Sequence, residues 1–209
     1  MNLAYITTEG AFPAELLKRM IPEHMLDVTY IFDGWHSSDA ITAATTLLTK
    51  RQCPVITLVD SHDYNGGTVR QQLYITRDIL YSATPGVLCE AYIADPESEG
   101  FLTWDRGVLE QVVQRSIADD EWATARTAPR ETLTAWLGSP EAIIAALDRL
   151  DTAAIERLRQ HPQLQHLLAT LDEAITEQRQ VVQAWEATQQ KGVETDATRE
   201  RLSATHYAA

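Results

Sequence analysis

Three acidic residues that lie far apart in the chain each follow a short apolar run. They are Glu9, Asp60 and Glu90, after the runs 3–6, 54–59 and 86–89. Such runs predict buried strands, and parallel strands deliver the residues at their carboxyl ends to one edge of a sheet. Carboxylates that meet there repel one another unless a cation lies between them, and a hard divalent ion is the usual cation. The pattern therefore predicts a metal site built from separate strands.

The elements that must position these acids alternate along residues 1–100. Apolar runs predict strands at 3–7, 27–32, 54–59 and 86–93, and helical spacing predicts helices at 12–20, 40–50 and 69–81. We expect Ser37-Ser38-Asp39 to cap the second of these helices. Alternation of this kind is typical of a parallel sheet with helices on both faces. We therefore expect an α/β fold, with a small doubly wound, Rossmann-like parallel sheet followed by an α-helical C-terminal region.

The second half of the chain changes character, because strand signals stop after Pro96. Helical patterns cover 105–117, 130–136 and 164–191, and Ser139-Pro140-Glu141 predicts a further helix start with a capping serine and proline in the first turn. We expect an α/β domain over 1–100, a helical region over 101–190 and a disordered tail over 191–209, which is polar and without periodicity. The helical region either packs on the sheet, extends as a hairpin or binds a partner.

Composition limits the classes of function. The chain has 209 residues and a formal net charge of −13, which argues against tight binding of nucleic acid through phosphate neutralisation alone. No apolar run is long enough to span a membrane, and the first residues lack the pattern of a signal peptide. The two cysteines, Cys53 and Cys89, fall in or beside predicted strands, as reduced core thiols do. We expect a cytoplasmic protein that makes no membrane contact.

Several common catalytic motifs are absent from the sequence. It contains no Gly-x-x-x-x-Gly-Lys phosphate loop, no Gly-x-Ser-x-Gly elbow and no Cys-x-x-Cys pair, and its six histidines show no metal-site spacing. The ordered acids therefore remain the leading candidates for chemistry. The flexible Asn65-Gly66-Gly67 turn is either a close approach for a phosphate backbone or an ordinary turn before a helix.

The order of these motifs resembles the Toprim family, the catalytic domain of topoisomerases, bacterial primases and overcoming-lysogenization-defect nucleases. The resemblance covers about residues 1–100 and rests on Glu9-Gly10, Gly34 and Asp60. In addition, the stretch from Cys89 to Asp95 is similar to the glutamate-aromatic-aspartate stretch of small Toprim-like proteins in bacterial defence loci.

This resemblance implies a function and a site. It implies a Mg²⁺- or Mn²⁺-dependent nuclease or related hydrolase of phosphodiesters, acting on nucleic acid within an anti-phage or mobile-element module, together with a partner ATPase that docks on the helical half. The implied catalytic residues are Glu9, Asp60 and Glu90. The implied metal ligands are Glu9, Asp60, Asp63 and Glu90, and Gly10 and Gly34 belong to the implied cofactor-binding loops.

One departure from the family pattern concerns the second aspartate after the third strand. The family has Asp-x-Asp, whereas this chain has Asp60-Ser61-His62-Asp63. Asp63 reaches the metal through a tighter turn, or His62 replaces the aspartate as ligand of a borderline metal such as manganese or zinc, or the position and the catalysis are lost.

Two other functions are therefore compatible with the sequence. A catalytically inactive Toprim-shaped binding or regulatory module accounts for both the shifted aspartate and the negative charge. A receiver-like signalling domain would use Asp60 as phospho-acceptor, but only one acid follows the first strand and no fifth strand with a lysine is visible.

Overall fold

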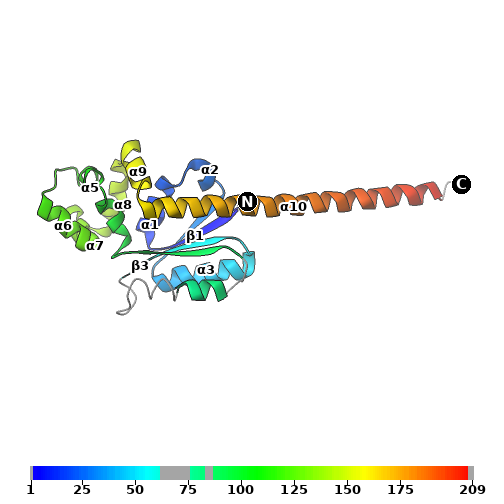
Figure 1. Cartoon of the computed structure of the whole chain (residues 1–209), viewed down its shortest axis with the longest axis horizontal. Helices are drawn as coiled ribbons and strands as arrows, with labels where there is room; N and C mark the ends of the chain where they lie inside the picture. The colour runs from blue at the N-terminus through cyan, green and yellow to red at the C-terminus, as the bar shows by residue number, and fades with distance from the viewer. Residues whose placement is uncertain (1, 62–75, 83–86, 207–209) are drawn as a thin grey trace.

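The computed structural model of the chain describes residues 2–61, 76–82 and 87–206, with side chains described up to residue 189. Within these residues, four strands form one all-parallel sheet, seen at the centre of Figure 1. Their order in the sheet is β2-β1-β3-β4. Their bounds are β1 (Ala4–Glu9), β2 (Thr29–Gly34), β3 (Val55–Asp60) and β4 (Cys89–Ala94). The predicted α/β class, with a parallel sheet and a helical C-terminal region, is confirmed.

The strand order reverses between β1 and β3. From β1 the chain crosses to β2 on one side and then returns to β3 on the other side of β1. All six residues of each of these two central strands are buried, as expected for strands covered on both faces. The carboxyl ends of β1 and β3 thus form the topological switch point, where open α/β sheets bind their ligands.

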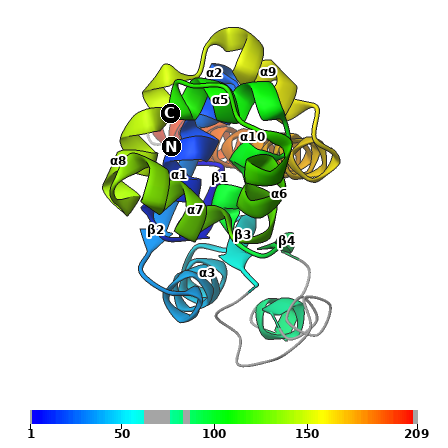
Figure 2. The same ribbon diagram turned by 90° about the vertical axis from the view of Figure 1, so that its left-hand side faces the viewer.

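Helices cover both faces of the sheet (Figure 2). One face packs against α1 (Ala11–Met20), α2 (Glu23–Leu26) and the start of α10 (Pro162–His206). The other face packs against α3 (Ser37–Arg51) and the helical residues 76–82, where Tyr5, Leu48 and Leu80 share a small core. The predicted helix at 69–81 is thus found in its last part, and the rest of it lies outside the described residues.

The second half of the chain consists of helices beyond the carboxyl end of the sheet. The 3₁₀ segment η1 (Ser98–Thr103) is followed by α5 (Arg106–Val113), α6 (Asp119–Thr127), α7 (Pro129–Leu137), α8 (Pro140–Ala146), η2 (Leu147–Arg149) and α9 (Thr152–Arg159). The predicted start of α8 is confirmed, because the Ser139 hydroxyl accepts a hydrogen bond from the Ala142 N–H and Pro140 is the first helical residue.

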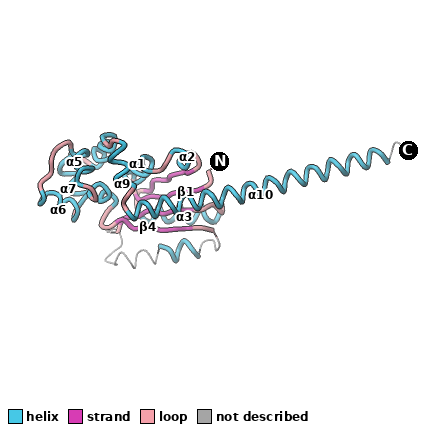
Figure 3. Tube along the Cα trace, turned by 45° about the horizontal axis from the view of Figure 1, so that its top comes forward, coloured by secondary structure: helices cyan, strands magenta, loops and turns pink. Residues whose placement is uncertain are grey.

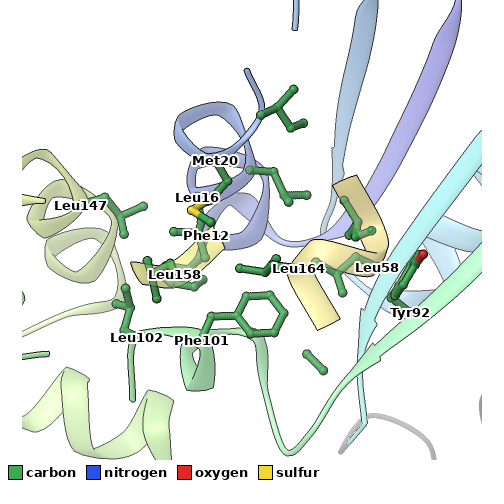
Figure 4. Packing of buried hydrophobic residues seen from close by; sticks show 14 of the residues in the cluster. Phe12, Leu16, Met20, Leu58, Tyr92, Phe101, Leu102, Leu147, Leu158 and Leu164 are labelled. Carbon is green, nitrogen blue, oxygen red and sulfur yellow. The ribbon is translucent and has the colours of Figure 1, made fainter. Parts of the chain in front are cut away.

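One hydrophobic core joins the sheet to these helices. It runs from Phe12 and Leu16 on α1, through Leu58 on β3, to Phe101 in η1 and Leu164 on α10 (Figure 4). Of the three arrangements left open for the helical region, packing on the sheet is therefore the one observed as far as Ile175, the last buried residue of this core.

The 45-residue helix α10 has two different parts. Its first part is buried through Leu164, Leu167, Leu171 and Ile175, whereas residues 179–189 are exposed apart from the half-buried Val182. Figures 1 and 3 show the second part projecting away from the rest of the molecule. At 1.5 Å per residue the whole helix is about 67 Å long.

The sequence pattern predicts disorder from residue 191, whereas α10 continues as a helix to His206. The expectation of disorder rests only on the absence of periodically spaced apolar residues in this stretch. No proline follows Pro162 to stop the helix, and residues of high helix propensity such as Glu, Arg and Ala recur up to its end.

None of the helices that the structure describes is both long enough and apolar enough to cross a membrane.

Candidate functional site

Two of the predicted site residues meet at the switch point. Glu9 is the last residue of β1 and Asp60 the last residue of β3. The Glu9 Oε2 atom accepts a 2.9 Å hydrogen bond from the backbone N–H of Asp60. Both side chains are buried, with exposed fractions of 5% for Glu9 and 1% for Asp60. The sheet therefore joins these acids, 51 residues apart in the chain, as the pattern of strand ends predicts.

A second donor to Glu9 comes from the start of α3. The Ser37 hydroxyl donates a 2.6 Å hydrogen bond to Glu9 Oε2. We expected Ser37-Ser38-Asp39 to cap this helix, but α3 begins at Ser37, and its N-cap residue, His36, makes no side-chain cap bond. The cap is missing because the serine that would form it lies inside the first turn and is hydrogen-bonded to Glu9 instead. Ser37 thus orients the Glu9 carboxylate.

The carboxylate of Asp60 is engaged by the helical half of the chain. Its Oδ1 atom accepts a 2.9 Å hydrogen bond from the Ser98 backbone N–H, and its Oδ2 atom accepts a 2.5 Å bond from Nη2 of Arg130. Arg130 also donates from Nε to Oε1 of Glu99, at 2.9 Å. One guanidinium therefore serves two buried carboxylates, Asp60 and Glu99, the latter only 4% exposed.

This sharing leaves an excess of negative charge beside Asp60. Burial first, and the nearby Glu99 carboxylate second, raise the pKa of Asp60 to about 6, although Arg130 and Ser98 act in the opposite direction. Most of the Asp60 carboxyls are thus ionised at neutral pH, but at an electrostatic cost. An additional cation or hydrogen-bond donor near Asp60 would lower that cost.

Sequence reasoning missed Glu99 and Arg130. Glu99 lies in η1, directly after β4, and Glu97 of the same stretch accepts a 2.9 Å hydrogen bond from the backbone N–H of Arg130 at the start of α7. A signal for the acids existed, since Glu97 and Glu99 follow the true end of the fourth strand at Ala94. No local signal marks Arg130, because its contact with Asp60 spans 70 residues.

The structure does not bring Glu90 to this site. In the sheet, Asp60 pairs with Ala94, whereas Glu90 pairs with Ile56 near the opposite end of β4. Four residues of strand separate the two positions, which is about 13 Å along the strand. Glu90 instead accepts hydrogen bonds from Arg77 at 2.8 Å and from the Tyr81 hydroxyl at 3.2 Å. The expectation that Glu90 ends its strand and converges with Glu9 and Asp60 is wrong.

The reason for this error lies in the run that precedes Glu90. The apolar residues Val87 and Leu88 suggest that the strand is already under way, but β4 begins only at Cys89. Glu90 is therefore near the start of the strand. An apolar approach to a strand and the strand itself have the same composition, so only the pairing with β3 distinguishes them.

The two predicted glycines form the turn next to the acids. Gly10 connects β1 to α1 with φ 84° and ψ 165°, a conformation that essentially only glycine adopts, and its N–H donates a 2.6 Å hydrogen bond to the Gly34 carbonyl. A Cβ on Gly34 would lie 3.1 Å from the Ala40 nitrogen. Both glycines thus hold β1, β2 and α3 close together, and Gly10 also reaches the cleft described next.

A cleft of about 450 Å³ opens at this end of the molecule. Its lining includes Glu9, Gly10, Trp35, His36, Glu99 and Arg130. The side chain of Arg130 is 36% exposed, and its Nη1 group makes no hydrogen bond with any described residue. The cleft therefore presents carboxylates together with a guanidinium that is anchored by two acids and has donors to spare for a ligand oxygen.

The residues at the switch point offer a Mg²⁺ ion few protein ligands. Among the residues that the structure describes, no three His, Cys, Asp or Glu side chains gather closely enough to hold a metal ion. Mg²⁺, however, is usually held by one or two carboxylates, with water and substrate phosphates completing its shell. The buried Ser98 hydroxyl, next in the chain to the N–H that binds Asp60, has no partner among those residues and is a spare oxygen at the site. Glu9 and Asp60 are therefore the candidate ligands.

Two further predicted positions are outside the described residues. Asp63, proposed as a metal ligand, and His62, its alternative, both belong to the 62–75 segment. The Asn65-Gly66-Gly67 turn lies there as well. The three interpretations of the shifted aspartate therefore stay open.

Comparisons with known proteins do not assign the chain to a family. No family model matches it, and neither a curated protein nor a solved structure does. The resemblance to Toprim domains therefore rests on the order of Glu9-Gly10, Gly34 and Asp60, and function has to be argued from the site.

Proposed function

We propose that this protein is a divalent-metal-dependent phosphodiesterase, most specifically a nuclease, whose site is the cleft at the carboxyl ends of β1 and β3. The observation that carries the proposal is the meeting of Glu9 and Asp60 at the switch point, in a setting that also contains the guanidinium of Arg130. Carboxylates and a guanidinium at one cleft are suited to two tasks of phosphodiester chemistry, ion binding and phosphate recognition.

The chain's own residues have distinct parts in this proposal. Arg130 recognises a phosphate oxygen through its Nη1 donors while Glu99 and Asp60 hold the guanidinium in place. Glu9, oriented by Ser37 and by the Asp60 N–H, accepts a proton from the attacking water. Asp60 and Glu9 would hold the Mg²⁺ or Mn²⁺ ion. When bound, such an ion polarises a phosphoryl oxygen and lowers the pKa of a coordinated water.

The revised acid set differs from the one that the sequence predicts. Glu99 replaces Glu90 as the third acid of the site: it lines the cleft together with Glu9 and shares Arg130 with the buried Asp60, whereas Glu90 lies near the other end of β4. The two acids thus provide a matched pair for an experiment. Neutralising Glu99 removes a charge from the site, whereas neutralising Glu90 removes a charge near the start of β4, away from the site.

The test is cleavage of single- and double-stranded DNA and RNA with Mg²⁺ or Mn²⁺, compared with EDTA. Glu9→Gln and Asp60→Asn are each expected to reduce the rate by about 10²-fold or more, which is the contribution of a general base or of a charge-stabilising group. Glu90→Gln is expected to retain near wild-type activity. Activity that persists in both Glu9→Gln and Asp60→Asn, or that is lost in Glu90→Gln with its fold intact, contradicts the proposed site.

A second candidate function is a non-catalytic binding or regulatory module of the same shape. It is favoured by one observation: both Asp60 oxygens already accept hydrogen bonds, from Ser98 and from Arg130. In this alternative Arg130 takes the place that a metal ion would need. Titration calorimetry with Mg²⁺ and Mn²⁺ separates the two functions, since absence of binding at millimolar metal supports the module and saturable binding that Asp60→Asn removes supports the enzyme.

The proposal extends to a partner. The part of α10 beyond Ile175 is mostly exposed and includes Val181 and Trp185, at 59% and 62% exposure, so it is available for docking. By its resemblance to small Toprim-like proteins, the chain is proposed to act with an ATPase in a cytoplasmic anti-phage or mobile-element module. Co-expression with an ATPase encoded beside its gene, followed by affinity purification, is expected to recover a complex, and loss of that complex on truncation after residue 180 would place the contact on α10.

A further inference from the structure

Trp35 has an unusual position for a tryptophan. It lies in the two-residue link between β2 and α3, and 88% of its surface is exposed, the highest value among the described large hydrophobic side chains that face solvent. Trp104, Trp122 and Trp136, in contrast, pack against the main core. Burial of an indole normally stabilises a fold, and exposing one gives up that gain. Trp35 therefore contributes little to the core, which points to a role outside folding.

The backbone around Trp35 is held firmly although its side chain is exposed. Gly34 is buried, pairs with Glu9 in the sheet and accepts the Gly10 N–H, and its close approach to Ala40 leaves no room for a side chain. On the other side, Ser37 is buried and bonded to Glu9. The indole is thus carried on a short, fixed link, so that a ligand stacking on it does not first have to order a loop.

This link opens onto the proposed active site. Trp35 lines the same cleft as Glu9, Gly10 and Arg130. The cleft therefore combines three kinds of group: a flat aromatic face, a guanidinium with free donors, and carboxylates. A nucleotide unit with an unpaired base has the matching parts, because its base stacks on aromatic side chains and its phosphate binds guanidinium groups.

We propose that Trp35 is a stacking platform for an unpaired nucleobase, so that the substrate class of this cleft is single-stranded nucleic acid. The proposal rests on the function proposed above and adds the form of the substrate. In a duplex each base is already stacked and paired, so its face is not available to an exposed side chain. The net charge of −13 argues against binding through phosphate neutralisation alone, so stacking has to supply a larger share of the affinity.

The experiment measures binding apart from cleavage. Fluorescence anisotropy with the full-length Glu9→Gln variant uses four labelled probes: a short single-stranded DNA, the same strand as RNA, its blunt duplex, and an abasic strand of equal length. Single strands are expected to bind more tightly than both the duplex and the abasic strand. Adding Trp35→Ala is expected to weaken single-strand binding roughly five- to 100-fold, the range found for one base–aromatic stack. Trp35→Phe, which keeps an aromatic face, is expected to lose much less.

A matched control is Trp185→Ala. Trp185 is also exposed, at 62%, but it lies on the projecting part of α10 and not among the residues that line the cleft. It is expected to leave single-strand affinity unchanged. The salt dependence of binding is expected to be the same for Trp35→Ala as for its parent, because stacking releases no counterions.

Several results overturn the inference: equal affinity for intact and abasic strands, tighter binding of the duplex, unchanged affinity in Trp35→Ala, or no binding of any probe. Its failure is distinguishable from failure of the proposed function. Metal-dependent cleavage that Asp60→Asn abolishes and Trp35→Ala leaves unchanged refutes the platform alone. Trp35-dependent single-strand binding without any cleavage refutes the catalytic proposal alone.

Discussion

At the scale of single residues, the acid at the end of β3 is strongly perturbed by its surroundings. Asp60 is buried next to Glu99, and the pKa of its carboxyl is raised to about 6. Its protonation therefore changes in the range where enzymes are usually assayed. The metal ion that we propose for this site would compete with that proton for the same oxygens.

We predict that the Asp60 carboxyl titrates near pH 6 in the folded protein and at lower pH in Glu99→Gln, because removal of a nearby negative charge favours the ionised form. Carbon-13 NMR of the aspartate carboxyls, with Asp60→Asn to assign the signal, measures both values. Under the proposed metal binding by Asp60, the affinity for Mg²⁺ is expected to fall about tenfold per pH unit below that midpoint. A midpoint near that of a free aspartate contradicts the prediction.

A second prediction concerns Arg130. Arg130→Met leaves Asp60 and Glu99 buried without their shared cation, which is expected to lower the free energy of unfolding by about 2–3 kcal/mol at neutral pH, somewhat below the cost of breaking a fully buried pair because Arg130 is partly exposed. The Asp60 pKa is higher in the folded than in the unfolded state, so the folded form binds more protons, and this carboxyl disfavours folding increasingly as pH rises from about 4 to about 6.

The loss in Arg130→Met is therefore expected to be smaller near pH 5, where Asp60 is mostly protonated. Urea denaturation at the two pH values measures it. The double variant Arg130→Met/Asp60→Asn serves as the control and is expected to recover part of the stability at neutral pH. An equal loss at both pH values would show that packing of the arginine, and not its charge, is what matters.

At the scale of elements, the site depends on how tightly β2, β1 and α3 approach one another. Gly34 is the contact point, since a Cβ there would lie 3.1 Å from both the Ala40 nitrogen and the Asp39 Cβ. Backbone cannot yield to such a contact as a flexible side chain can. The position of Ser37, and through it the orientation of Glu9, follows from this approach.

Gly34→Ala is accordingly predicted to lower the free energy of unfolding by about 1–3 kcal/mol, the usual cost of adding a methyl group to a packed region. Gly100→Ala is the matched control, because its added Cβ would meet Pro129 at an ordinary distance of 3.7 Å. Chemical denaturation of both variants decides the point. Comparable stability of the two would mean that α3 moves away without cost.

The sequence allows prediction of the elements better than of the site. Each central strand contains a continuous apolar run that ends shortly before or at its terminal acid, so Glu9 and Asp60 could be placed at the ends of β1 and β3. The start of β4 could not, because Val87 and Leu88 are apolar outside the strand too, and this misplaced Glu90. Arg130 approaches Asp60 only through the packing of η1 and α7, which no local pattern encodes.

At the scale of the whole molecule, α10 divides into a part that belongs to the core and a part that does not. Leu171 is fully buried in the core that also contains Leu58, whereas Val181, ten residues later, is 59% exposed. The stability of the fold should therefore depend on the first part of the helix alone. The second part is free to change without loss of folding.

We predict that Leu171→Ala lowers the free energy of unfolding by about 2–5 kcal/mol, as large-to-small changes in a core do. Val181→Ala, on the same helix, is expected to change it by less than about 0.5 kcal/mol, as is usual for an exposed site. Thermal or urea denaturation gives both values. A large loss in Val181→Ala would indicate that the projecting part packs against something, such as a second chain.

The 70-residue span between Asp60 and Arg130 has a consequence for the synthesis of the protein. On the ribosome, β3 emerges long before the guanidinium that will neutralise its terminal acid, and the sheet face that packs against α1 and α2 stays incompletely covered until α10 is made. We expect chaperones to bind the exposed apolar surface of the nascent chain during that interval. A gene shortened after codon 100 would accordingly encode an aggregation-prone fragment with exposed apolar surface, and not a smaller folded domain.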